Sequence, residues 1–214
     1  MKKILSIAAI LCLMLSFALP IRAAGFSVGL SPSKTSVSAG EMVTFTVTVT
    51  GAGKATSGYI EVALNDSFEL VSGKLLVSNV KTGDFDVSTS DGAFLYSEES
   101  DPNGGLCEFV VKAKTAGKTA RKVSVTVDLK NGSTLLGSIS ESREVKIGCA
   151  SHVYGAWEQK DSGTHLHTCT VCGEVQSEAH KWNGGEVTRP ATCKEAGNKR
   201  YTCTVCGQTK DETL

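Results

Sequence analysis

The sequence predicts an all-β protein in which a β-sandwich is followed by a pair of small repeats. From residue 26 to residue 147, apolar and polar residues alternate in short stretches separated by Gly, Ser, Asn and Asp. This period of two is typical of half-buried strands, and no stretch keeps an apolar stripe of helical period over three turns. Further on, the hexapeptide Thr-Cys-Thr-Val-Cys-Gly occurs at 168–173 and again at 202–207, which marks a tandem repeat.

Residues 1–23 have the pattern of a secretory signal peptide. Two lysines are followed by an apolar run over residues 4–19, Pro20 ends the run, and Ala23 offers a small residue for cleavage. A membrane-spanning helix needs about 20 apolar residues, so a retained anchor is the less favoured alternative. Cys12 lies within the run and is interpreted as an apolar residue of the signal, not as a lipid attachment site.

Cleavage after Ala23 removes three positive charges and no acid, so the net charge changes from 0 to −3. Nucleic-acid binding needs clustered Lys and Arg, and no basic run is longer than Arg121-Lys122. The sequence therefore argues against a nucleic-acid partner. It predicts a secreted or cell-surface protein with no retained transmembrane helix.

The alternation is clearest over residues 43–49, where Val43, Phe45, Val47 and Val49 share one face and threonines lie between them. Further candidate strands lie at 60–64, 109–113, 123–129 and 145–147, with shorter ones at 26–30, 75–77, 85–87 and 94–96. Many short strands at this spacing predict an antiparallel β-sandwich. We assign it to residues 24–148, a length that can bury its own core.

The order of these segments resembles cohesin domains, the jelly-roll modules that bind dockerins in cellulosomes, and their carbohydrate-binding relatives. The segments that carry the likeness are 38–45, 58–71, 84–85, 94–96, 103–114, 116–118, 123–127 and 144–147. The resemblance implies a cohesin-like jelly-roll β-sandwich that binds a dockerin-like protein partner. Residues 65–68 read Asn-Asp-Ser-Phe where cohesins usually show Tyr-Asp-Pro-Ser, and no dockerin-contact residue is carried over.

Each repeat carries four residues of types that bind metals, in the same order. The first repeat, residues 149–179, offers His152, His165, Cys169 and Cys172. The second repeat, residues 180–214, offers His180, Cys193, Cys203 and Cys206. Four N and S donors that include a Cys-x-x-Cys turn are the donor set of a tetrahedral structural zinc site. The sequence therefore predicts a zinc-ribbon-like tandem region that holds about two Zn²⁺ per chain.

Alternatives to this assignment stay open. A secreted chain can use cysteines for disulfides, and Cys-x-x-Cys can be a redox pair, although the paired histidines favour zinc. His167 can replace His165, and each site can recruit the histidine of the following repeat. Cys107 and Cys149 are left over, either as a disulfide that closes the sandwich or as two buried thiols.

The repeats also resemble the His/Trp/Cys-x-x-Cys modules at the ends of clostridial and other Firmicute cell-surface proteins. The residues that carry this likeness are His152, Tyr154, Trp157, His180, Trp182 and the segment 191–207. The resemblance implies a location outside the cell and a stalk or wall-proximal role. The aromatic residues are expected to pack around the metal sites, with sugar stacking as the alternative.

No catalytic motif is readable in the chain, and the acidic cluster at 98–101 is interpreted as solvated surface. The sequence thus predicts a non-catalytic binding or scaffold protein. Its partner is a dockerin-type or other protein, or alternatively a polysaccharide bound by a carbohydrate-binding module. Exposed aromatics along one sheet face would favour a sugar. The aromatics of the sandwich fall mostly at core positions, which favours a protein.

Overall fold

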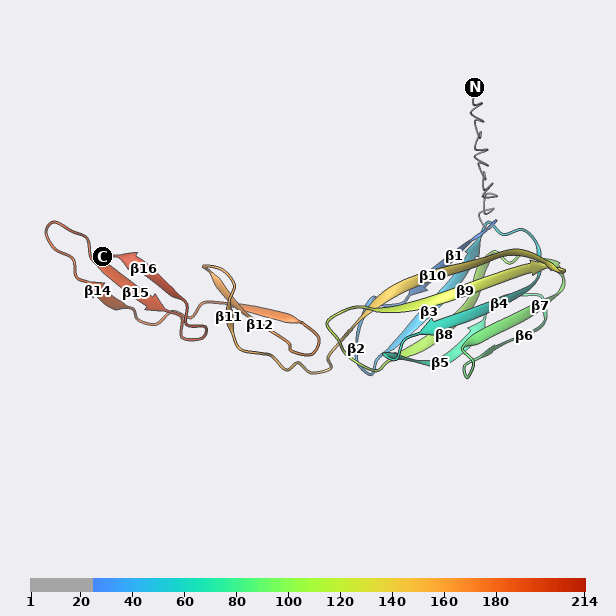
Figure 1. The fold of residues 1–214 in the computed structure, drawn as a ribbon, viewed down its shortest axis with the longest axis horizontal. Helices are drawn as coiled ribbons and strands as arrows, with labels where there is room; N and C mark the ends of the chain where they lie inside the picture. The colour runs from blue at the N-terminus through green and yellow to red at the C-terminus, as the bar shows by residue number, and fades with distance from the viewer. Residues whose placement is uncertain (1–24) are drawn as a thin grey trace, which may run out of the picture.

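The computed structural model describes residues 25–214, so the predicted signal peptide lies outside the described residues. Every regular element in this range is a β-strand, which confirms the all-β fold class. Figure 1 shows a two-layered sandwich, followed by two small sheets that succeed one another in a row. No helix within residues 25–214 is long and apolar enough to cross a membrane.

Two sheets make up the sandwich. The four-stranded sheet has the order β1 (Ser27–Pro32), β3 (Met42–Thr50), β8 (Gly104–Ala113) and β5 (Phe68–Leu75). The six-stranded sheet has the order β2 (Ser36–Ser38), β10 (Thr134–Gly148), β9 (Arg121–Asn131), β4 (Ala55–Leu64), β7 (Asp91–Ser100) and β6 (Val80–Asp86). All neighbouring strands in the two sheets are antiparallel except β2 and β10, which are parallel.

The core lies between the two sheets and follows the predicted alternation. In β3 the residues Val43, Phe45, Val47 and Val49 are fully buried, while the intervening threonines are half-buried or exposed. Phe45 stacks on Phe109 of β8, with ring centroids 5.2 Å apart. The period of two therefore directs one face of each central strand into the core, and burial of that face supplies the main stabilisation.

The observed strands differ from the predicted ones in several places, since β2 and most of β5 match no predicted strand. Of the candidate strand at 75–77, only Leu75 lies in a strand, as the last residue of β5. The long first part of β10 has no counterpart in the prediction. Its apolar residues are only partly buried or, like Leu135, exposed, so the alternation that marks a buried face is weak there.

The repeats form one three-stranded antiparallel sheet each. The first contains β11 (Glu158–Gln159), β12 (Thr164–Thr168) and β13 (Val175–Ala179). The second contains β14 (Glu186–Arg189), β15 (Asn198–Thr202) and β16 (Thr209–Thr213). We refer to the sandwich, the first repeat and the second repeat as the three modules. In the described part of the chain, no sheet contains strands of more than one module.

Candidate metal centres

The identical hexapeptides of the two repeats fold into the same turn. The Gly173 N–H donates to the carbonyl of Cys169 at 3.0 Å, and the Gly207 N–H donates to the carbonyl of Cys203 at 3.0 Å. Both glycines have positive φ, 74° and 76°, a conformation that glycine adopts without steric cost. The glycine after each Cys-x-x-Cys thus closes the turn and holds its two sulfurs together.

A second backbone bond brings a histidine to each turn. Thr170, which follows the first cysteine of its turn, donates its N–H to the carbonyl of the residue after His152 at 2.9 Å. Thr204 donates in the same way to the carbonyl of the residue after His180, at 2.8 Å. The two repeats therefore share one local framework, although the spacing from histidine to turn differs between them.

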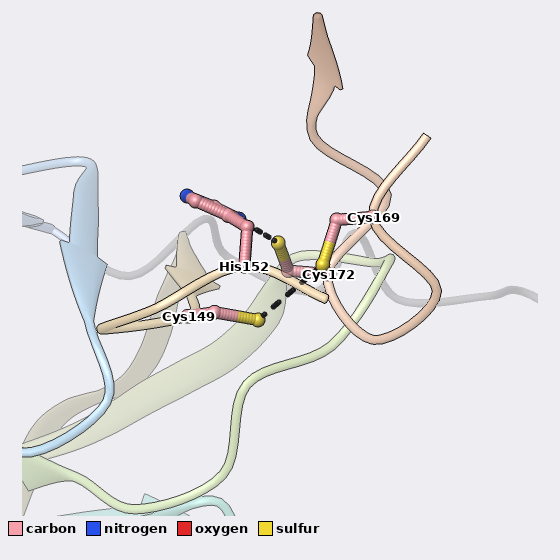
Figure 2. A group of neighbouring side chains, drawn as sticks. All are labelled: Cys149, His152, Cys169 and Cys172. Carbon is pink, nitrogen blue, oxygen red and sulfur yellow. Dashed lines mark hydrogen bonds between the residues drawn. The ribbon is translucent and has the colours of Figure 1, made fainter. Parts of the chain in front are cut away.

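The first group of donors, the first tetrad, consists of Cys149, His152, Cys169 and Cys172, whose donor atoms all lie within 4.8 Å of one another. The side chains converge on one point beside the turn (Figure 2). Cys149 Sγ lies 3.8 Å from Cys169 Sγ, and Cys172 Sγ lies 3.3 Å from His152 Nδ1. Three sulfurs and one imidazole nitrogen thus face a common centre.

The second tetrad consists of His165, His180, Cys203 and Cys206. The two imidazole Nδ1 atoms face each other at 3.3 Å, and the sulfurs of Cys203 and Cys206 lie 3.6 Å and 3.4 Å from the Nδ1 atoms of His165 and His180 respectively. His180 Nε2 donates to the carbonyl of Asp161 at 3.0 Å. Such a bond fixes the tautomer and leaves Nδ1 as the donor atom for a metal.

These separations fit a tetrahedral zinc ion. With Zn–S of about 2.3 Å and Zn–N of about 2.05 Å, ideal tetrahedral geometry requires about 3.8 Å between sulfurs, about 3.6 Å from S to N and about 3.4 Å between nitrogens. Cys149 and Cys169 have their sulfurs 3.8 Å apart, three S–N pairs lie at 3.3–3.6 Å, and the two Nδ1 atoms of the second tetrad lie at 3.3 Å. All donor atoms within each tetrad lie within 4.8 Å of one another. A disulfide would place its sulfurs about 2.05 Å apart, and all seven cysteines in residues 25–214 are unbridged.

The burial pattern of the repeats points to the same centres. Apart from Gly197, every buried residue after Gly148 belongs to a tetrad. These residues are His165, Cys169, Cys172, His180 and Cys203. No aliphatic side chain is buried in this described segment, so each repeat is organised around its polar donors and not around an apolar core.

The turns also favour thiolates, the form of cysteine that binds metals. The Cys172 backbone N–H lowers the pKa of Cys169 to about 5, against the opposing effect of burial. Burial raises the pKa of Cys203, but backbone N–H groups of Cys206 and Val205 outweigh it and bring the pKa to about 5.

Cys149 differs from the turn cysteines because its pKa is raised to about 12, first by its hydrogen bond to Cys172 and then by burial. A cysteine binds a metal as the thiolate, so metal binding releases this proton.

The structure groups the predicted donors differently from the spacing. His165 lies in the second tetrad and not the first, whereas Cys193 is exposed in the loop between β14 and β15 and belongs to neither. The extra residues of the second repeat fall in this loop, so the strand position that corresponds to His165 is occupied by Lys199. Both His165 and Cys193 follow a histidine by 13 residues, but His165 lies in a strand and Cys193 lies in a loop.

Sequence reasoning also left Cys149 out of the first site. The signal was present, since Cys149 and His152 are three residues apart, a separation that suits two ligands of one ion. Cys107, its suggested disulfide partner, lies in the sandwich core, where burial raises its thiol pKa to about 12.

His167, the alternative to His165, has a different role. It is stacked between Tyr154 and Trp157, with ring centroids 4.1 Å and 3.7 Å away, and its Nε2 lies 3.1 Å from Gln176 Oε1. Trp157 also packs edge-on against His165 at 4.5 Å. The aromatic residues of the first repeat thus surround its histidines.

Replacement of both turn cysteines, Cys203 and Cys206, by serine is expected to lower the zinc content from about two ions per chain to about one, because only two donors of the second tetrad remain. Cys193→Ser is the matched control and is expected to keep both ions, since this cysteine is exposed and outside the tetrads. Elemental analysis of the purified variants measures the content. Loss of an ion from Cys193→Ser would restore the assignment based on spacing.

Comparison with known proteins gave similarities of structure alone. No family profile matches the sequence, and no curated protein matches it. A non-cellulosomal cohesin from Archaeoglobus fulgidus is 12% identical, with a TM-score of 0.40, over 57% of this chain and 86% of its own. A type II cohesin domain from the cellulosome of Acetivibrio cellulolyticus is 12% identical, with a TM-score of 0.35, over 58% of this chain and 90% of its own. BcpA, the major pilin subunit of Bacillus cereus, is 6% identical, with a TM-score of 0.40, over 88% of this chain and 66% of its own.

Proposed function

We propose that this chain is a secreted or cell-surface, non-catalytic binding protein. Its sandwich binds a protein partner of the dockerin type or a related surface protein. The two repeats, each organised around one Zn²⁺, form a stalk that carries the sandwich. The domain limits that we propose are residues 24–148 for the sandwich, 149–179 for the first repeat and 180–214 for the second.

The placement of the aromatic side chains supports a protein partner over a polysaccharide. Seven of the eight aromatic residues of the sandwich are buried: Phe26, Phe45, Phe68, Phe85, Phe94, Tyr96 and Phe109. The eighth, Tyr59, is 40% exposed, and its hydroxyl donates to Asp91 at 2.7 Å, a bond that raises the tyrosine pKa to about 12. Sugar-binding faces stack pyranose rings on exposed aromatic side chains, and a single tyrosine on the sandwich does not make such a row.

The zinc part of the proposal is supported by donor chemistry and distance. Each tetrad offers only sulfur and imidazole nitrogen, the donors that Zn²⁺ prefers, and it offers four of them. Such closed sites are structural, because no position is left for water or substrate. The metal therefore contributes to folding of the stalk and not to catalysis.

Partner capture from the cell envelope tests the binding function. The zinc-loaded chain of residues 24–214 is immobilised and exposed to envelope extract of the source organism, either untreated, digested with proteinase K or oxidised with periodate. We expect binding to be lost after proteinase K and kept after periodate, which destroys sugars. The reverse result would identify a polysaccharide ligand and overturn the proposal.

Tyr59→Ala is a matched control for this experiment, because Tyr59 is the exposed aromatic residue of the sandwich. Stacking on an aromatic ring contributes strongly to sugar binding, whereas a protein interface that does not centre on Tyr59 is little changed by its loss. We expect the variant to capture the envelope partner as well as the unmodified chain does.

A further inference from the structure

The first tetrad lies at the boundary between two modules, because Cys149 is the first residue after the sandwich and the other donors lie within the first repeat. Cys149 directly follows β10, whose last residues are fixed in the sandwich. The carbonyl of Gly148 accepts a bond from Ala39 at 2.9 Å, and that of Ile147 accepts one from Gly117 at 3.0 Å. The sulfurs that Cys149 faces belong to the turn of the first repeat (Figure 2). A metal held here is therefore bound to the sandwich on one side and to the first repeat on the other.

The second tetrad repeats this arrangement one module further along. His165 is fully buried in β12, the central strand of the first repeat, where it pairs with Gln159 and Glu178. His180 is tied to the same repeat by two bonds, from its backbone N–H to the carbonyl of Gly163 at 3.1 Å and from Nε2 to the carbonyl of Asp161. The two sulfurs of the tetrad belong to the turn of the second repeat.

Outside the first tetrad, one ion pair among the described residues joins the sandwich to the first repeat. Lys146 Nζ lies 3.8 Å from a carboxylate oxygen of Glu174, and both side chains are largely exposed, so water and salt screen this pair. Gly173 lies beside Lys118 of the sandwich. No strand of one module pairs with a strand of another within the described chain, so the shared tetrad is the main link at this junction.

We infer that each metal ion joins two consecutive modules, so that the two ions hold the sandwich and both repeats in one rigid, extended row. This inference rests on the proposed binding of zinc. In each site the two thiolates of the Cys-x-x-Cys turn come from the following module. A donor held in place by the preceding module completes the set: Cys149 directly after β10, or His165 within β12. The bound metal thus determines the orientation of the sandwich relative to the two repeats.

Cys149 and His165 are the ligands that join consecutive modules. Their loss is therefore expected to have a different effect from the loss of a turn cysteine. Without Cys149, the histidine and two turn cysteines of the first tetrad still lie together on the first repeat. The ion keeps three protein donors and can complete its shell with water, as open zinc sites do. The repeat stays folded while its connection to the sandwich becomes flexible.

Backbone ¹⁵N relaxation on the zinc-loaded chain of residues 24–214 tests the inference. In the unmodified protein one anisotropic diffusion tensor is expected to describe the amides of all three modules. In Cys149→Ser we expect this common tensor to be lost, with shorter correlation times for the repeats than in the unmodified chain. Lys146→Ala, which removes the ion pair at the same junction, is expected to keep it.

Two further variants keep the result decisive if the first repeat of Cys149→Ser unfolds. Cys149→His returns a metal donor to the same position and is expected to restore common tumbling, which a purely structural role of the thiol would not produce. His165→Ala is expected to release the second repeat alone, leaving the sandwich and first repeat tumbling together.

Metal content, measured on the same samples, separates the possible failures. Common tumbling of Cys149→Ser and of His165→Ala, in chains that keep about two ions, would overturn the inference and leave the proposed zinc sites intact. An unmodified chain that binds no zinc would overturn the proposed sites together with the inference. In Co²⁺-substituted Cys149→Ser, the sulfur-to-metal charge-transfer absorption is expected to fall by the contribution of one thiolate.

Discussion

Removal of zinc by a chelator is expected to unfold both repeats while the sandwich stays folded. The buried side chains of the repeats belong to the metal tetrads, so little apolar burial is left to stabilise these small sheets once the donors are free. Structural zinc contributes about 10–16 kcal/mol to the folding of comparable small domains. Elemental analysis should find about two Zn²⁺ per chain. Amide NMR spectra should show collapse of the repeat resonances as chelator is added.

The fragment of residues 24–148 is the control for this result. Its core is closed by the buried faces of two sheets and contains no tetrad donor, so it is expected to unfold cooperatively at a midpoint that chelator does not change. A midpoint of the fragment that shifts with chelator would contradict the prediction that only the repeats need metal to fold. Metal-free repeats that keep their native spectra would contradict it as well.

Replacement of Phe109 by alanine is expected to lower the free energy of unfolding of the sandwich by about 3–5 kcal/mol, the usual cost of emptying a buried phenylalanine site. Phe109 is fully buried in a central strand of the four-stranded sheet and stacks in parallel on Phe45. Phe45 and Phe109 are fully buried and directly opposite each other on paired strands, so the close-packed surroundings have little freedom to fill the cavity. Denaturant unfolding of the fragment 24–148 measures the change.

Thr46→Ala is the matched control, since Thr46 lies on the outer face of β3, next to Phe45. Surface changes of this kind alter stability by about 0.5 kcal/mol or less. The Phe109→Ala chain should still bind both zinc ions, because no donor is touched. A change below about 1 kcal/mol would show that the two sheets are not packed around this residue.

The strands of the sandwich core and the cysteine turns were determined by the sequence alone. In β3 and β9, side chains alternate between faces with a period of two, so a regular run of valines separated by polar residues dictates which face is buried. The Cys-x-x-Cys-Gly turns are equally local, because their closing bonds join residues four apart and the final glycine allows positive φ. Identical hexapeptides gave identical turns for this reason.

The composition of each tetrad was decided only by the tertiary structure. Sequence spacing paired His165 with the first turn and Cys193 with the second, but the end of β10 brings Cys149 to the first turn, and β12 presents His165 to the second. Which distant side chain completes a four-donor site depends on how consecutive modules are oriented. That orientation arises from strand ends and loop lengths, such as the longer β14–β15 loop that carries Cys193 away, and no local pattern of residues encodes it.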